Sequence, residues 1–288
     1  MAHAPAAAWL QSPFYRAPLI RSAVAFGALL STLLGVSAPV TASDDPWPSI
    51  RKDVFQERPL HEDSGAVQIF APNQADDAAI VPVTVRIPSN YAATAKSLTL
   101  LIDRNPAPVA ATFAFGDGFR STPDIGERML STRVRVDAFS RVRAILETTD
   151  GKLHMTSKFV IGSGGCSAPA SKDPDEAVAQ LGKTQLKVFK NESHGPNWRE
   201  AQVMVRHPNF TGMQMNKKTG QFTPARFVNF LEVKQGEQLL FRMEGGISIS
   251  EDPNIRFTYG TSKEADLDFV AKDTDGIIFK GSSLGDPS

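Results

Sequence analysis

Short runs of alternating apolar and polar residues recur along the chain from residue 80 onward. In Ile80–Ile87, the side chains of Val83, Val85 and Ile87 fall on one face, because successive residues of a strand point to opposite sides. Further segments of this kind follow, with turn residues between them: Leu98–Ile102, Val109–Phe115, Ser131–Val136, Arg141–Thr148 and Leu153–Val160. So many short strands in close succession predict an antiparallel β-sandwich.

A glycine- and serine-rich stretch at residues 162–171 interrupts this pattern, and its composition is typical of a flexible linker. A second series of strands follows it: Leu186–Phe189, Ala201–Arg206, Ala225–Val233, Gln238–Met243, Arg256–Tyr259, Leu267–Ala271 and Ile277–Phe279. We therefore expect an all-β protein with two sandwich domains. The first spans residues 43–167 and ends in a glycine-cysteine arm, a Gly/Ser-rich linker spans 168–184, and the second domain spans 185–288.

The first 42 residues differ from the rest of the chain. They contain no Asp or Glu, Arg16 and Arg21 precede an apolar run, and small residues lead up to Ala42. This order is typical of a secretory signal peptide. The apolar run is about 12 residues long, whereas a membrane span needs about 20. We expect cleavage after Ala42, a periplasmic product without a membrane segment, and a short amphipathic helix at Trp47–Glu57.

Charge and composition exclude several functional classes. The chain has 31 basic and 31 acidic side chains, and this balance argues against nucleic-acid binding, which needs a basic excess. A single cysteine forms neither an intramolecular disulfide nor a cysteine metal cage. Phosphate-binding, dinucleotide-binding and Ser-His-Asp motifs are absent from the sequence. The sequence therefore gives no indication of an enzyme.

Cys166, the one cysteine, lies within the glycine-serine stretch. A free cysteine is usually a small buried apolar residue. Here its neighbours offer no apolar packing, so we expect an exposed and mobile thiol. An unpaired thiol in an oxidising compartment is a liability unless it is used. Covalent carriage of a sulfur or acyl group fits such a thiol, because no general base lies near it in the sequence.

The first half of the chain resembles SoxY, the sulfur-carrier subunit of the thiosulfate-oxidising Sox system. The matching segments are Ile80–Ile87, Lys96–Gly118, Ser131–Val136, Arg141–Lys152 and Lys158–Cys166. The second half resembles SoxZ at Val205–Gly212, Gly220–Val233, Ile247–Tyr259 and Leu267–Gly276. The fused order is similar to that of the SoxYZ-like carriers associated with quinoprotein dehydrogenases.

The resemblance implies two immunoglobulin-like sandwiches and a periplasmic carrier whose cysteine holds sulfur intermediates covalently. Cys166 is then the attachment residue. The flexible arm that presents it consists of Gly162, Ser163, Gly164 and Gly165. The implied partners are Sox-type enzymes, or a quinoprotein dehydrogenase and its cytochrome c, and no cofactor is implied beyond the sulfur adduct. The family pattern ends after two further glycines, whereas Ser167 and Ala168 follow Cys166 here and the chain continues, which tethers the arm at both ends.

Two other interpretations stay open. One is a non-covalent adaptor for a periplasmic dehydrogenase or cytochrome, in which Cys166 is dispensable. The other is a copper-binding protein, because imidazole and thioether ligands suit Cu(I) and His207, Met213 and Met215 lie close together, with His194 upstream. Packing of the methionines on the rim of the sandwich is the favoured explanation for this group.

Overall fold

The computed structural model describes residues 45–120, 126–170, 174–190, 197–260 and 266–283. The chain divides into two units, Met1–Asp44 and Asp45–Ser288. The predicted signal peptide, residues 1–42, falls in the first unit and lies outside the described residues. In the part that the structure describes, no helix is long and apolar enough to cross a membrane.

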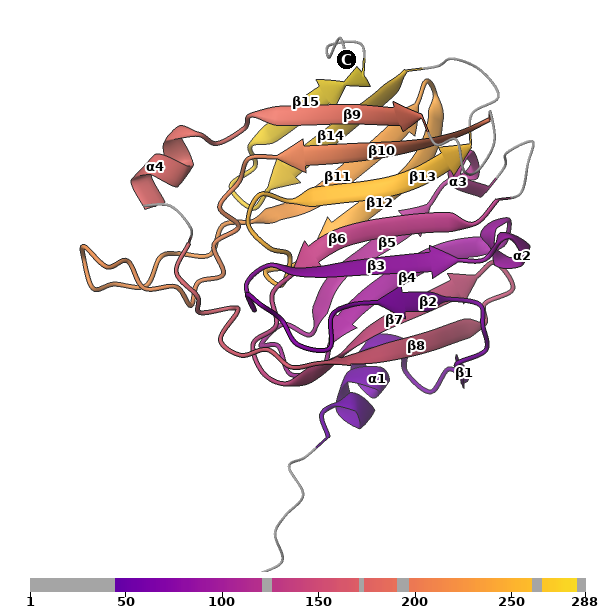
Figure 1. The fold of residues 1–288 in the computed structure, drawn as a ribbon, viewed down its shortest axis with the longest axis horizontal. Coiled ribbons are helices and arrows are strands. Elements are labelled where there is room, and N and C mark those ends of the chain that lie inside the picture. Colours follow the sequence, from indigo (N-terminus) through magenta and orange to yellow (C-terminus); the bar gives the residue numbers. More distant parts are fainter. Residues whose placement is uncertain (1–44, 121–125, 171–173, 191–196, 261–265, 284–288) are drawn as a thin grey trace, which may run out of the picture. The chain divides into compact units, whose positions relative to one another are not determined.

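The second unit consists of two β-sheets packed face to face (Figure 1). The nine-stranded sheet has the order β1 (Leu60–Glu62), β8 (Leu153–Val160), β7 (Ser140–Thr148), β4 (Ala95–Ile102), β5 (Val109–Phe115), β12 (Gln238–Gly245), β11 (Val228–Gln235), β14 (Leu267–Asp273) and β15 (Ile278–Ser282). The six-stranded sheet has the order β2 (Gln68–Phe70), β3 (Val81–Ile87), β6 (Arg128–Val134), β13 (Asn254–Gly260), β10 (Trp198–Val205) and β9 (Thr184–Lys190). The helices are α1 (Trp47–Phe55), α2 (Ser89–Ala92), α3 (Asp117–Arg120) and α4 (Pro174–Ala179).

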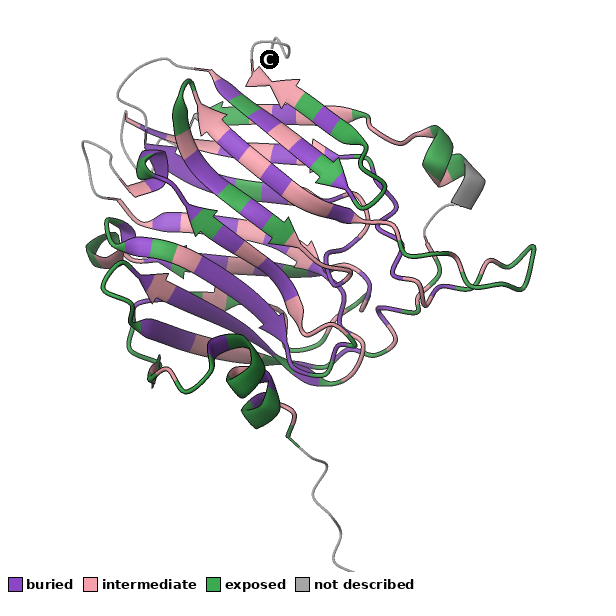
Figure 2. Ribbon diagram, turned by 180° about the vertical axis from the view of Figure 1, so that it is seen from behind, coloured by how far each residue is buried: buried purple, intermediate pink, exposed green. Residues whose placement is uncertain are grey.

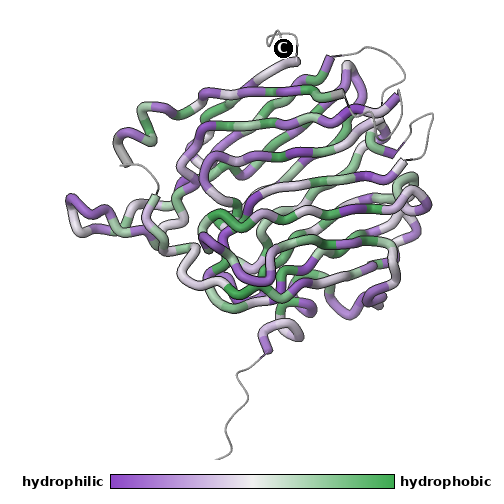
Figure 3. The backbone as a smooth tube through the Cα atoms, viewed as in Figure 1, coloured by the Kyte–Doolittle hydropathy of each residue, from purple (hydrophilic) through white to green (hydrophobic). Residues whose placement is uncertain are grey.

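The all-β prediction is confirmed. Strand β3 illustrates the reason, because Val81, Val83, Val85 and Ile87 are buried while Arg86 is exposed. The same alternation of hydrophobic and hydrophilic positions is visible along many strands in Figure 3. Among the described strands the pairing is antiparallel except between β1 and β8, which the sequence pattern did not predict.

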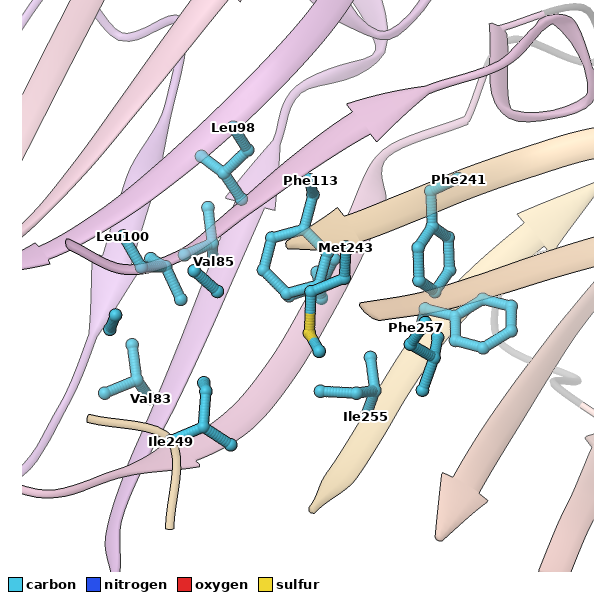
Figure 4. Packing of buried hydrophobic residues seen from close by; sticks show 14 of the residues in the cluster. Val83, Val85, Leu98, Leu100, Phe113, Phe241, Met243, Ile249, Ile255 and Phe257 are labelled. Atoms are coloured by element: carbon cyan, nitrogen blue, oxygen red, sulfur yellow. The ribbon is translucent and has the colours of Figure 1, made fainter. Parts of the chain in front are cut away.

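The two predicted sandwiches share both sheets. Strand β5 of the first half pairs with β12 of the second, and β6 pairs with β13. The core is therefore continuous: Phe113 of the first half lies edge-to-face with Phe241 of the second, and Figure 4 shows apolar side chains from both halves packed together. The prediction of a flexible linker between two separate domains is not confirmed, because the sheets themselves join the halves.

A second, smaller apolar cluster lies on the outer face of the nine-stranded sheet, where α1 packs (Figure 2). Trp47, Ile50 and Phe55 of α1 contribute to it. The guanidinium of Arg143 lies 4.0 Å from the centre of a Trp47 ring and forms a buried ion pair with Asp103 at 2.8 Å. The predicted amphipathic helix is thus confirmed, and its apolar face covers strands β4, β7 and β8.

Candidate functional site: the glycine-cysteine turn

The residues after β8 form a turn that is hydrogen-bonded to the chain following β6. The backbone N–H of Gly164 donates to the carbonyl of Asp137 (2.8 Å), and that of Gly165 donates to the carbonyl of Val136 (3.0 Å). The N–H of Ala168 closes the turn by donating to the carbonyl of Gly164 (2.8 Å). Gly164 has a φ of 74°, which favours glycine. Residues 162–168, which we call the cysteine turn, therefore have a defined conformation.

The expectation of an exposed, mobile thiol is wrong for this conformation, because Cys166 is 0% exposed. Close backbone packing explains its burial. A Cβ added at Gly165 would lie 2.1 Å from the carbonyl oxygen of Ala78, and one at Gly162 would lie 3.3 Å from Val136. Of the predicted flexible arm, Gly162 and Gly165 are buried, Gly164 is half-buried and Ser163 is exposed. At Gly165 the missing side chain thus permits close approach of two backbones.

Side chains from both halves of the chain hold the cysteine turn. On the first-half side, the backbone N–H of Cys166 donates to Asp137 Oδ1 (3.1 Å), and Arg135 Nη1 donates to the carbonyl of Gly165 (3.1 Å). On the second-half side, Thr211 Oγ1 donates to the carbonyl of Cys166 (2.6 Å), and Gln214 Nε2 donates to the carbonyl of Ala168 (3.1 Å). The turn is therefore closed by direct hydrogen bonds on both sides of the cysteine.

Burial also changes the chemistry of the thiol. It raises the pKa of Cys166 from 9.0 to about 12, with the negative charge of Asp137 acting in the same direction and the guanidinium of Arg135 acting against it. At neutral pH the thiol is protonated, and the thiolate is the nucleophilic form of cysteine. In the closed conformation Cys166 is thus both inaccessible and chemically unreactive.

Arg135 links the cysteine turn to a buried polar layer of the second half. Its side chain is 1% exposed, and Nη2 donates to the carbonyl of Asn209 (3.4 Å). Asn209 has a φ of 44°, and its side-chain amide donates to the carbonyls of Ile249 (3.3 Å) and Ser250 (3.1 Å). Burial lowers the pKa of Arg135, while the negative charge of Glu251 opposes that shift. The layer fixes the connection between β10 and β11 against the turn.

Among the candidate copper ligands, His207 has both ring nitrogens engaged within the protein. His207 is 1% exposed, and its Nδ1 accepts the backbone N–H of Asn209 at 3.0 Å. Its Nε2 therefore carries the proton and lies 3.4 Å from Asp273 Oδ2. Met213 is half-buried, whereas Met215 is 53% exposed and pairs with Phe222 in an isolated bridge. His207 thus has a structural role, while His194 lies outside the described residues.

The residues that hold the cysteine turn were not predicted from the sequence. Asp137, Thr211 and Gln214 carry no motif of their own. Alternation in the segment Ser131–Val136 places Arg135 on a solvent-facing strand position, but the strand ends at Val134 and the arginine turns inward. Only the presence of an arginine next to an apolar strand end hints at this role. The remaining contacts depend on residues 29 to 46 positions away from their partners.

The two halves match two families of sulfur-oxidation proteins. The family model of sulfur oxidation protein SoxY matches residues 51–166, and that of sulphur oxidation protein SoxZ matches residues 188–283. No curated protein matches the chain. Among solved structures, the sulfur carrier protein SoxY from Chlorobium limicola f thiosulfatophilum has 23% sequence identity and a TM-score of 0.31, covering 40% of this chain and 90% of that chain. A beta-glycosidase from Bacteroides vulgatus has 10% identity and a TM-score of 0.22, covering 78% of this chain and 24% of that chain.

Proposed function

Because the chain belongs to the SoxY and SoxZ families, fused in tandem as a sulfur-oxidation carrier protein, we propose that Cys166 is the residue that carries the sulfur group covalently. One observation carries this proposal: the match to SoxY ends at Cys166. This cysteine lies in a turn whose other residues are glycine, serine or alanine. Such a segment fits into a narrow partner site once it is released.

The carrier works by opening the cysteine turn. Residues 162–168 contribute almost no apolar side chain to the core, so opening breaks hydrogen bonds and exposes the thiol without disturbing either sheet. Local opening of this kind requires less free energy than global unfolding. Once the turn is open, the desolvation that raises the pKa of Cys166 is removed, and the thiolate becomes available. The closed form protects the thiol between transfers.

Adduct formation also requires an electron acceptor. Joining the protonated thiol to a sulfur anion creates one S–S bond and releases one proton and two electrons. A redox partner must take up these electrons. We assign this role to a periplasmic partner, either another Sox enzyme or a quinoprotein dehydrogenase with its cytochrome c. The acid-free N-terminal segment with its apolar run supports the periplasmic location.

Intact-mass analysis of protein purified without reductant tests the covalent role. We expect mass adducts that reductant removes from the wild-type chain and from Ser163→Ala, a matched change on the exposed part of the turn. Cys166→Ser is expected to carry none. A wild-type chain that shows only free thiol after incubation with a sulfur substrate and its redox partner would refute covalent carriage.

The complete burial of Cys166 favours a second candidate, the non-covalent adaptor, because a buried cysteine is commonly structural. In that case partner binding depends on the protein surface and not on the thiol. Affinity capture with Cys166→Ser separates the two functions. An adaptor retains the partner and its activity, whereas a covalent carrier retains binding at most and loses sulfur transfer.

A further inference from the structure

A cavity of about 670 Å³ opens at the end of the six-stranded sheet that faces the cysteine turn. It is lined at the ends of β6, β9, β10, β13 and β15. Two of its residues, Arg206 and Asp252, also line a smaller cavity beside Ala170, which follows the turn. These strand ends lie on the left in Figure 1, on the same side as the connection between β10 and β11. The cavity is thus a neighbour of the turn, yet Cys166 does not line it.

The charges that the described residues bring to this cavity are mainly positive. Arg133, Lys183 and Arg206 contribute three cations, and Asp252 contributes a carboxylate. The oxygens of Asp252 are already engaged, because Oδ2 pairs with Arg206 and Oδ1 accepts the backbone N–H of His207 (3.1 Å). The net positive charge that remains resides on Arg133 and Lys183. An anion is therefore the ligand that this lining attracts.

Arg133 presents a fixed cation to this cavity. Its Nη2 donates to the carbonyl of Asp252 (2.8 Å), which fixes the direction of the guanidinium. Its Nε is enclosed by protein, so a ligand in the cavity meets the charge of the guanidinium and not this donor. An oxyanion placed against the guanidinium gains a charge-assisted interaction.

The size and the remaining lining indicate an organic anion and not a simple inorganic ion. Met204 lies opposite Gln185 on one neighbouring strand and Asn254 on the other, which places a thioether between two amides. A volume of about 670 Å³ falls in the range of small-molecule sites, which is about 300–1,000 Å³. The site offers cations to a head group and an apolar surface to a short chain.

We propose that this cavity binds a small organic anion whose carboxylate or sulfonate group is held by Arg133 and Lys183 and whose apolar part lies over Met204. This non-covalent site is distinct from Cys166 and does not depend on the covalent function of the thiol. It supplies the carrier with a second, independent ligand at the end of the molecule where the thiol is released.

Isothermal titration of the full chain with sodium butanesulfonate, at constant ionic strength, tests the proposal. We expect saturable binding by the wild type and at least tenfold weaker binding by Arg133→Gln and by Lys183→Gln. Lys187→Gln is the matched control, because Lys187 lies on the neighbouring β9 but does not line the cavity. Its affinity is expected to equal that of the wild type.

Several results would overturn the proposal. Equal weakening by Lys187→Gln would show a diffuse charge effect, and binding of sulfate as tight as that of butanesulfonate would refute an organic ligand. Tight binding of hexaglutamate without binding of butanesulfonate would identify an acidic peptide as the ligand instead. If Arg133→Gln does not fold, Lys183→Gln decides alone, because Lys183 is exposed and its replacement leaves the core intact.

Discussion

Replacement of Thr211 by valine is expected to accelerate modification of Cys166. Thr211 Oγ1 donates to the carbonyl of Cys166 (2.6 Å), and valine keeps the shape of the side chain but removes this donor. The closed turn then contains a buried carbonyl with one hydrogen bond fewer, whereas water solvates the same carbonyl in the open turn. The loss destabilises the closed form by about 1–3 kcal/mol. The open population is therefore expected to rise by about 5- to 150-fold.

The raised pKa makes the modification rate a direct measure of opening. At pH 7.5 a thiol with a pKa of about 12 is ionised in about three molecules per 100,000, against about three per 100 at its usual value of 9.0. The open turn thus reacts about a thousandfold faster than the closed turn, even before access is considered. Open molecules dominate the observed rate once they exceed about one in a thousand.

The assay is the rate of alkylation by iodoacetamide at pH 7.5, followed by intact mass. Thr211→Ser is the control, because serine keeps the hydroxyl donor, and it is expected to react at a rate near that of the wild type. Leu98→Ala is a second control, since it destabilises the core by about 2–5 kcal/mol without touching the turn. Equal rates for the Val and Ser variants would refute the role of Thr211. Acceleration by Leu98→Ala would show that the thiol is exposed by global unfolding.

Three further results are expected from the same geometry. Gly165→Ala places a Cβ 2.1 Å from the carbonyl oxygen of Ala78, so the turn is expected not to close. Iodoacetamide is then expected to react with Cys166 far faster than in the wild type. A rate equal to that of the wild type would contradict this packing. Asp137→Asn keeps an oxygen acceptor but removes a negative charge that raises the pKa of Cys166. The midpoint of the pH–rate profile for reaction with iodoacetamide is therefore expected to move to lower pH. An unchanged profile would exclude the charge effect. Burial lowers the pKa of His207, so at mildly acidic pH the unfolded chain binds a proton that the folded chain does not. The free energy of unfolding is therefore expected to decline as the pH falls below the usual histidine pKa of 6.5. Urea midpoints at pH 7.5 and 5.5 test this, and equal midpoints would contradict it.

Most strands are predictable from the sequence because strand alternation is a local signal. The predicted segments Val109–Phe115 and Leu153–Val160 match β5 and β8 end to end. Strands β1 and β2 were missed because three residues are too few to show a period. The joining of the two sandwiches was also missed, since the pairing of β5 with β12 leaves no mark in the alternation of either strand.

The state of Cys166 was not predictable for a related reason. Composition describes only what the neighbours in sequence contribute, and the neighbours of Cys166 contribute little apolar surface. Its burial is supplied by segments that are distant in sequence: the carbonyl of Ala78, the chain at Val136, and Thr211 of the second half. The identity of the candidate residue followed from sequence, whereas its protonation and accessibility required the tertiary structure.

Fusion of the two halves limits how far the cysteine turn can extend and fixes which residues it contacts when closed. Cys166 follows Val160, the last residue of β8, by six positions, so a fully extended chain carries it at most about 20 Å from the end of that strand. Because both sheets run through the two halves, Thr211 and Gln214 always face the turn. A partner that contacts the connection between β10 and β11 would act on the same residues that hold the turn closed. Under the proposed function, we expect docking at this connection to release the thiol within about 20 Å of the end of β8.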